Sequence, residues 1–172
     1  MTAENGPVCR DNIILIGMPG AGKSTVGPLL ARKLGFAFAD TDELVRKADG
    51  RDLKDIVAED GLEKFLEIQK TIIMSTAFKS SVIATGGGVV NSGELMRYFK
   101  NIGKVIYLKQ DFEVLEKRLK PGRRLARKAG QDFRSLFEER DPLYAGYADH
   151  IVYCGEKTPE KIVQEILDEC RI

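Results

Sequence analysis

The chain has 172 residues, of which 43% are hydrophobic and 31% charged, and these values are ordinary for a single soluble globular domain. Its formal net charge of +1 argues against a protein that coats nucleic acid through bulk electrostatics. No apolar run approaches the roughly 20 residues that span a bilayer, and the start of the chain is too polar for a signal peptide. We therefore expect a cytoplasmic protein with neither a membrane nor a nucleic-acid partner.

Short apolar runs alternate with helical periodicity after a loose tail at residues 1–10. This alternation predicts an α/β fold in which helices cover both faces of a parallel sheet. The near-continuous apolar character of the strands is typical of strands buried on both faces, and ligands in such folds bind beyond the carboxyl ends of the strands. The predicted strands are residues 12–16, 36–39, 81–84, 104–108 and 150–153, and the helical stripes are Val26/Leu29/Leu30/Leu34, Leu62/Phe65/Leu66/Ile73 and Ile162/Val163/Ile166/Leu167.

The loop after the first strand reads GMPGAGKST, residues 17–25, and fits the spacing G-x-x-x-x-G-K-[ST]. Such a loop wraps phosphates in backbone N–H groups, while Lys23 reaches the β- and γ-phosphates and Ser24 holds Mg²⁺. Its position between a strand and a helix favours a phosphate-binding function over a chance match. The predicted ATP-binding residues here are Gly20, Ala21, Gly22, Lys23, Ser24 and Thr25, although Thr25 is more typical of the first turn of the next helix.

The loops after the second and third strands also carry candidate site residues. In ADTDEL, Asp40 and Asp42 alternate, so one carboxylate can face a metal and the other a neighbouring cavity. A helix N-cap is the competing explanation for these acids. In TGGGVV, the glycines at 86–88 predict close approach of the backbone to a ligand, with a bare flexible turn as the alternative.

A basic run follows the fourth strand. Residues 117–128 contain seven lysines and arginines and no acid. A solvated surface is the usual explanation for such a run, but the Pro121-Gly122 pair makes a long surface helix awkward. A mobile lid that brings arginine to the phosphates fits better. The N-K-x-D and D-x-x-G motifs of GTPases are absent from the sequence, which argues against a nucleotide switch.

The remaining reactive side chains show no pattern of their own. Cys9, Cys154 and Cys170 are odd in number and lack C-x-x-C spacing, so we interpret them as reduced thiols. His150 is the only histidine, begins a predicted strand and is interpreted as structural.

Together these motifs resemble the shikimate kinase family, within the nucleoside-monophosphate-kinase-like branch of P-loop proteins, from about residue 12 to 168. The resemblance implies a three-layer α/β/α P-loop kinase fold with a central five-stranded parallel sheet, one domain over 1–172 and a mobile lid at about 117–132. It also implies a monomer that uses ATP and Mg²⁺ to convert shikimate to shikimate 3-phosphate in aromatic amino acid biosynthesis. The motifs are GMPGAGKST, FADTDEL, DGLEKF, IATGGGVV, ERDPLY and TPEKIVQEIL.

The resemblance implies roles for residues around the acceptor. Asp42 would bind the acceptor hydroxyls and accept the proton during attack. Arg140 would pair with the acceptor carboxylate, a bidentate contact that suits a guanidinium, although a surface ion pair with Glu138 or Asp141 is the alternative. The residues expected against the acceptor ring are Gly86, Gly87 and Gly88.

It also implies roles at the nucleotide. Asp40 would help to hold the Mg²⁺ shell through water, and Arg118 and Pro159 would flank the adenine. Arg123 would be the lid arginine nearest the transferring phosphate, with Arg124 as the open alternative because the family's R-P-L-L reads RRLA in this chain.

Two positions on the acceptor side depart from the family pattern. The usual F-R-x-x-E reads FLEIQ, so Leu66 and Gln69 replace an arginine and a glutamate. Both charges are lost together, which avoids an unpaired carboxylate in a partly buried site. The departure leaves two alternatives to shikimate phosphorylation: a kinase of the same fold with another small acceptor, or a weakly active nucleotide-binding regulatory protein.

Overall fold

Five parallel strands form one sheet in a computed structural model that describes residues 11–121, 125 and 127–170. The strand order is β2-β3-β1-β4-β5, so the first strand lies at the centre, paired with β3 and β4. The predicted α/β class and five-stranded parallel sheet are confirmed. The strands are β1 Asn12–Ile16, β2 Ala37–Asp40, β3 Ser81–Ala84, β4 Gly103–Lys109 and β5 His150–Tyr153.

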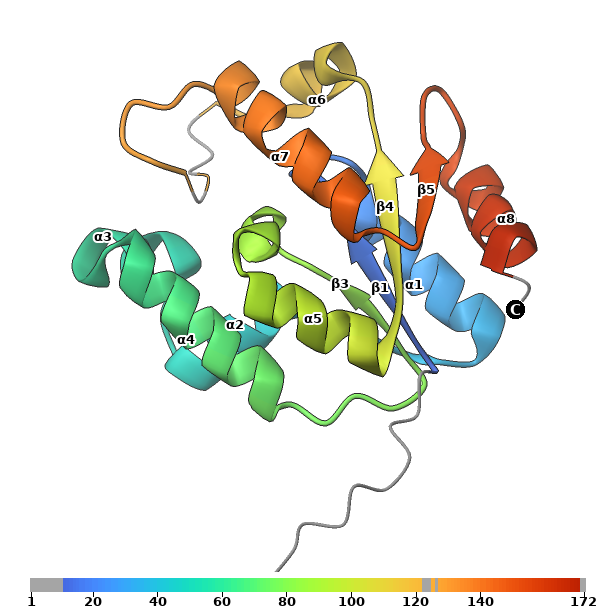
Figure 1. Ribbon diagram of the computed structural model, residues 1–172, viewed down its shortest axis with the longest axis horizontal. Helices are drawn as coiled ribbons and strands as arrows, with labels where there is room; N and C mark the ends of the chain where they lie inside the picture. The colour runs from blue at the N-terminus through green and yellow to red at the C-terminus, as the bar shows by residue number, and fades with distance from the viewer. Residues whose placement is uncertain (1–10, 122–124, 126, 171–172) are drawn as a thin grey trace, which may run out of the picture.

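Helices cover both faces of this sheet (Figure 1). α1 and α8 pack together on one face, and α5 and α7 contact β4 on the other. Among the described residues, no helix has the length and apolarity needed to cross a membrane. The helices are α1 Lys23–Leu34, α2 Thr41–Asp49, α3 Leu53–Asp60, α4 Leu62–Ser75, the 3₁₀ turn η1 Gly87–Asn91, α5 Gly93–Ile102, α6 Phe112–Arg118, α7 Phe133–Tyr147 and α8 Pro159–Cys170.

The prediction that every strand is buried on both faces is wrong for the two edge strands, β2 and β5; in β5, Tyr153 is 61% exposed. Every residue of β1 and β3 is buried, whereas Phe38 in β2 is 39% exposed. β2 pairs with β3 alone and forms an edge of the sheet. The Phe38 ring instead packs over Gly27 of α1, where a Cβ atom would come within 2.5 Å of the ring.

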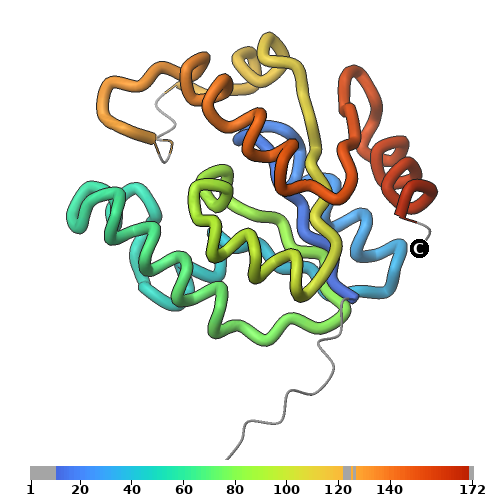
Figure 2. The backbone as a smooth tube through the Cα atoms, in the orientation of Figure 1, coloured from blue at the N-terminus to red at the C-terminus, as the bar shows by residue number. Residues whose placement is uncertain are grey.

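Two hydrophobic clusters stabilise the molecule. The larger one surrounds the sheet, and a separate cluster of Val45, Ile56 and Phe65 holds α2, α3 and α4 together. Figure 2 shows this three-helix unit and residues 127–132, which precede α7, on the same side of the molecule. Residues of α3 and α4 and residues 127–130 line the cavity described next.

Candidate active site

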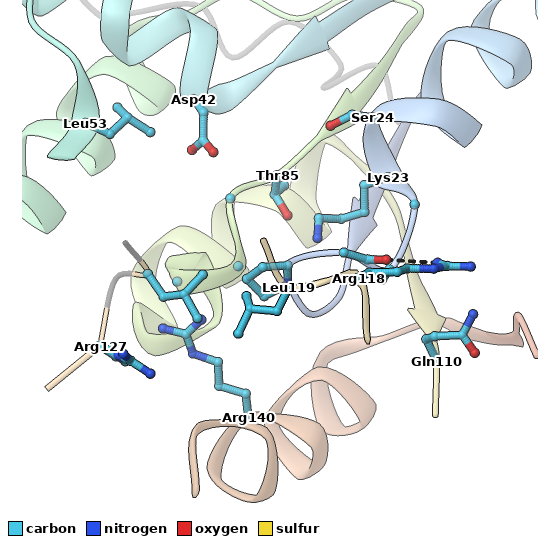
Figure 3. Close-up of a pocket in the computed structure, with 18 of the residues that line it drawn as sticks. Lys23, Ser24, Asp42, Leu53, Thr85, Gln110, Arg118, Leu119, Arg127 and Arg140 are labelled. Atoms are coloured by element: carbon cyan, nitrogen blue, oxygen red, sulfur yellow. Dashed lines mark hydrogen bonds between the residues drawn. The ribbon is translucent and has the colours of Figure 1, made fainter. Parts of the chain in front are cut away.

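A cavity of about 1080 Å³ opens at the carboxyl ends of β1, β2 and β3. Figure 3 shows its side chains converging from the loop before α1, the start of α2, the glycine loop after β3, and α7. Arg123 lies outside the described residues. All other predicted site residues line this one cavity: Gly20, Ala21, Gly22, Lys23, Ser24, Thr25, Asp40, Asp42, Gly86, Gly87, Gly88, Arg118, Arg140 and Pro159.

The phosphate-binding loop has a backbone that only glycine adopts readily. Gly17 and Gly22 have φ angles of +148° and +102°, and a Cβ atom on Gly17 would lie 2.7 Å from the Leu108 carbonyl oxygen. Gly22 directly precedes α1, so the N-terminus of that helix faces the cavity and favours anions. Lys23 is 7% exposed, and its Nζ donates hydrogen bonds to the carbonyl oxygens of Gly17 at 2.6 Å and Met18 at 2.9 Å. The loop is therefore already curled around the lysine.

Asp40 and Asp42 take different positions at the start of α2. Asp40 is the N-cap, since its Oδ1 accepts hydrogen bonds from the backbone N–H groups of Asp42 at 2.8 Å and Glu43 at 3.3 Å. The capping explanation thus holds for Asp40, which lines the cavity as well. Asp42 lies in the first helical turn, and its Oδ1 comes within 2.6 Å of where a Cβ atom on Gly86 would sit. Gly86 therefore leaves room for the Asp42 carboxylate.

The glycine loop is pinned in place, which argues against a bare flexible turn. The Gly86 N–H donates to the Thr41 hydroxyl at 2.9 Å, and the Tyr144 hydroxyl donates to the Gly87 carbonyl oxygen at 2.6 Å. A side chain on Gly87 would collide with Pro19, because its Cβ would lie 2.8 Å from the Pro19 ring. The loop therefore presents bare backbone to the cavity at a fixed position.

Arg140 is a buried residue of α7, not a surface one. Only 1% of it is exposed, and its Nη1 lies 3.1 Å from the position of a Cβ atom on Gly87. The alternative of a surface ion pair between Arg140 and Asp141 does not hold, because Asp141 has other partners. Asp141 accepts a hydrogen bond from the Tyr107 hydroxyl at 2.6 Å and forms an ion pair with Lys109 at 3.1 Å. The guanidinium of Arg140 thus points toward the glycine loop, as Figure 3 shows.

Tyr144, one turn along α7 from Arg140, stays protonated at neutral pH. Burial raises the pKa of Tyr144 to about 12, and the positive charge of Arg140 acts in the opposite direction. A neutral phenol can donate the hydrogen bond to Gly87, so burial preserves this link between α7 and the glycine loop.

The opposite end of the cavity is formed by loops after β4 and β5. Arg118 donates from Nη1 to the Gly20 carbonyl oxygen at 3.0 Å, which links α6 to the phosphate-binding loop. Gln110 and Cys154 also line the cavity and were missed at the sequence level. Burial raises the pKa of the Cys154 thiol to about 11, so it remains protonated. Their position directly after predicted strands was the signal that could have found them.

The two residues that depart from the family pattern, Leu66 and Gln69, lie on α4 and line different cavities. Gln69 is 2% exposed and lines the cavity next to Gly86. Leu66 packs against the cluster of α2, α3 and α4, as its stripe predicted, and lines a smaller cavity of about 260 Å³. The helix therefore presents no charge to either cavity from these two positions.

The lid prediction falls partly outside the described residues, because Arg123 and Arg124 are not among them. From the described part of the basic segment, Arg127 and Lys128 line the main cavity. Sequence analysis placed both in the basic run without assigning either to the site.

The residues predicted to hold Mg²⁺ fit that ion. Ser24 and Asp40 line the same cavity beside the phosphate-binding loop. Within the described residues there is no cluster of three or more potential metal-binding acids, cysteines or histidines. Mg²⁺ at a nucleotide commonly uses one or two protein groups together with phosphates and waters, so a small donor set is appropriate.

Comparisons with known proteins agree with this geometry. A family profile described as "Shikimate kinase" matches residues 19–171. The shikimate kinase of Persephonella marina is 41% identical over 163 residues, which cover 93% of this chain and 99% of the relative. The crystal structure of shikimate kinase from Aquifex aeolicus is 35% identical, with a TM-score of 0.79 and coverage of 93% of this chain and 96% of that one. The shikimate kinase from Acinetobacter baumannii, solved in complex with shikimate, is 30% identical, with a TM-score of 0.85 and coverage of 93% and 92%.

Proposed function

The chain belongs to the shikimate kinase family, and we propose that it transfers the γ-phosphoryl group of ATP to a hydroxyl of shikimate, forming shikimate 3-phosphate. One observation carries the proposal. Asp42 approaches Gly86 and Arg140 approaches Gly87 of the glycine loop, in the same cavity as the phosphate-binding loop. A hydroxyl and a carboxylate on one small acceptor match these two side chains.

In this proposal, the nucleotide phosphates occupy the loop before α1. The backbone N–H groups at the helix start bind the phosphates, and Lys23 exchanges its two carbonyl partners for phosphate oxygens. Ser24 directly and Asp40 through water would hold Mg²⁺, which would supply positive charge to neutralise the nucleotide phosphates. Arg118 and Pro159 flank the adenine at the other end of the cavity.

The acceptor lies against the backbone of the glycine loop. Asp42 accepts a hydrogen bond from the reacting hydroxyl and takes its proton as the oxygen attacks the γ-phosphorus. The bond from the γ-phosphorus to the bridging oxygen of the β-phosphate breaks in the same transfer, and ADP leaves. Arg140 binds the carboxylate and fixes which hydroxyl faces the phosphate. Catalysis is therefore mainly positioning and charge neutralisation, with Arg123 as the arginine of the basic segment at the transferring phosphate.

The test is a coupled ATP-consumption assay with Mg²⁺, run with and without shikimate, with the product identified by ³¹P NMR. We expect ATP consumption that depends on shikimate and a new phosphate-monoester signal. A rate that is the same with and without shikimate would contradict the proposal. The proposal includes a monomeric, cytoplasmic enzyme, which light scattering of the purified chain and cell fractionation test.

A second candidate is a kinase of the same fold for another small hydroxy acid. The uncharged Leu66 and Gln69 favour it, because they change the acceptor end and leave the phosphate-binding loop untouched. A screen of small hydroxy acids in the same assay separates the two candidates: turnover with another acceptor and none with shikimate supports the second.

A further inference from the structure

The α4 wall of the acceptor end has no positive charge. The α4 residues that line the two cavities are Leu62, Phe65, Leu66 and Gln69, and all are uncharged. A carboxylate bound beside Arg140 is therefore met by one guanidinium from α7 and by none from α4. Any second cation must come from another element.

Three cations line both the main cavity and the smaller cavity beside it: Arg127, Lys128 and Arg140. The smaller cavity is lined by neither Lys23 nor Arg118, as far as the described residues go. These three cations therefore surround the acceptor end, away from the phosphate-binding loop. In Figure 3, Arg127 likewise lies on the side of Arg140, with Gln110 on the other side.

We propose that Arg127 supplies a second guanidinium to the carboxylate of the acceptor, opposite Arg140. The inference rests on the proposed function and assigns a specificity-determining residue to it. Two planar guanidiniums can bind one carboxylate on both of its oxygens, which fixes its orientation as well as its charge.

Lys128 is the poorer candidate because it already has a carboxylate partner. Its Nζ lies 3.7 Å from Glu139 Oε2, an oxygen that also accepts a hydrogen bond from Gln131 at 2.7 Å. Arg127, in contrast, forms no ion pair within 4.0 Å in the described part of the chain, and its charge acts on the Asp132 carboxylate only at longer range. Arg127 is exposed and lines the cavity, so its guanidinium is accessible to an anionic ligand.

Leu66 gives this arrangement a physical rationale. It lines the smaller cavity together with Arg127 and Arg140 and contributes apolar surface there. An arginine at position 66 would add a fourth cation to a small cavity that Arg127, Lys128 and Arg140 already line, so the leucine is compatible with the two guanidiniums. Arg127 from the segment after α6 thus performs a task that α4 cannot.

The experiment compares steady-state kinetics of the wild-type chain with those of the Arg127→Ala, Arg127→Lys and Lys128→Ala variants. Shikimate and its neutral carboxamide serve as acceptors. We expect Arg127→Ala to raise the KM for shikimate about 10- to 100-fold and to change the KM for ATP less than about twofold. The KM for shikimate of Arg127→Lys should lie between those of the wild-type chain and Arg127→Ala, because lysine keeps the charge and loses the bidentate geometry. Lys128→Ala removes one charge from the same segment and should have a much smaller effect.

The carboxamide identifies the contact. The wild-type chain and Arg127→Ala should use it with similar KM values, because a neutral amide cannot form the ion pair. A rescue adds to this test: Leu66→Arg with Gln69→Glu, introduced into Arg127→Ala, should restore much of the affinity for shikimate by moving the second guanidinium to α4.

The outcomes separate this inference from the proposed function. A wild-type chain that phosphorylates shikimate, with an unchanged shikimate KM in Arg127→Ala, would overturn the inference and leave the function standing. An equal rise in the KM for ATP would also overturn it, since Arg127 would then serve the phosphates. No shikimate turnover by the wild-type chain would refute the proposed function, and the inference with it.

Discussion

Lys23 is held across its own loop by hydrogen bonds to the backbone. Its two hydrogen bonds, at 2.6 Å and 2.9 Å, go to carbonyl oxygens of Gly17 and Met18, and the residue is 7% exposed. The carbonyl oxygens of the loop thus provide hydrogen-bond partners for a buried ammonium group and hold the lysine side chain within the loop. The side chain therefore loses little rotamer freedom when it binds a phosphate.

We predict that Lys23→Met abolishes phosphoryl transfer and leaves the fold intact. Methionine has a similar length and keeps the packing, but it cannot donate to the transferring phosphate, so kcat should fall at least about 10²- to 10³-fold. The measurement is kcat by the coupled assay together with the thermal midpoint by circular dichroism. Lys33→Met, in the exposed last turn of α1, is the matched control and should retain normal activity. A fully active Lys23→Met variant would refute the assignment of the loop.

At the scale of elements, α7 organises the acceptor end through two side chains on one of its faces. Tyr144 pins the glycine loop through the hydrogen bond to Gly87 and stacks on Tyr107 of β4 at a ring-centroid distance of 5.1 Å. Arg140 projects from the same helix one turn earlier and reaches that loop. The position of the loop and the position of the guanidinium are therefore set by one helix against one strand.

We predict that Tyr144→Phe raises the KM for the acceptor several-fold and leaves the KM for ATP unchanged. The variant loses the hydrogen bond to the glycine loop but keeps the ring, and the free energy of unfolding should fall by about 1–2 kcal/mol. Steady-state rates at varied acceptor and varied ATP concentrations give the two KM values, and urea unfolding gives the free energy of unfolding. Tyr98→Phe is the control. The Tyr98 hydroxyl donates a hydrogen bond to the Thr76 carbonyl oxygen at 3.3 Å, and neither residue lines the cavity. Equal changes in both KM values would show that α7 does not act on the acceptor end alone.

How well the elements are predicted from sequence depends on what determines each one. All five strands were predicted to within one residue of their observed ends, because buried parallel strands form short apolar runs. The exposure of Phe38 could not be predicted, since strand order decides which strand lies at an edge, and local pattern does not encode strand order.

The site residues likewise divide into those that local sequence predicts and those that only the fold brings to the cavity. Lys23 and Ser24 belong to a loop whose spacing alone predicts phosphate binding, and the structure places them together. Gln110 was missed because it carries no motif and acquires its place from the end of β4. Arg127 was visible only as one of seven cations in a run, and the sequence does not show which of these cations line the cavity.

At the scale of the whole molecule, the core that supports the site contains several titratable groups in their neutral form. Tyr107, Tyr144 and Cys154 all belong to the hydrophobic cluster around the sheet. Burial raises the pKa of each of them, and for Tyr107 the hydrogen bond to Asp141 acts in the same direction. Folding therefore keeps protons on groups that the unfolded chain would release in alkaline solution.

We predict that this molecule loses stability between about pH 10 and pH 12, and that Tyr144 causes a measurable part of the loss. An unfolded tyrosine ionises near a pKa of about 10, whereas Tyr144 in the folded chain has a pKa of about 12. Its contribution is therefore complete below pH 10 and disappears as the pH rises through 12, a loss of about 2–3 kcal/mol. Guanidinium unfolding of the wild type and Tyr144→Phe at intervals from pH 7 to 11.5 measures it. The difference in unfolding free energy should stay constant up to about pH 9 and then narrow, because phenylalanine has no proton to lose. A constant difference up to pH 11.5 would mean that the Tyr144 hydroxyl ionises in the folded chain as it does in the unfolded one.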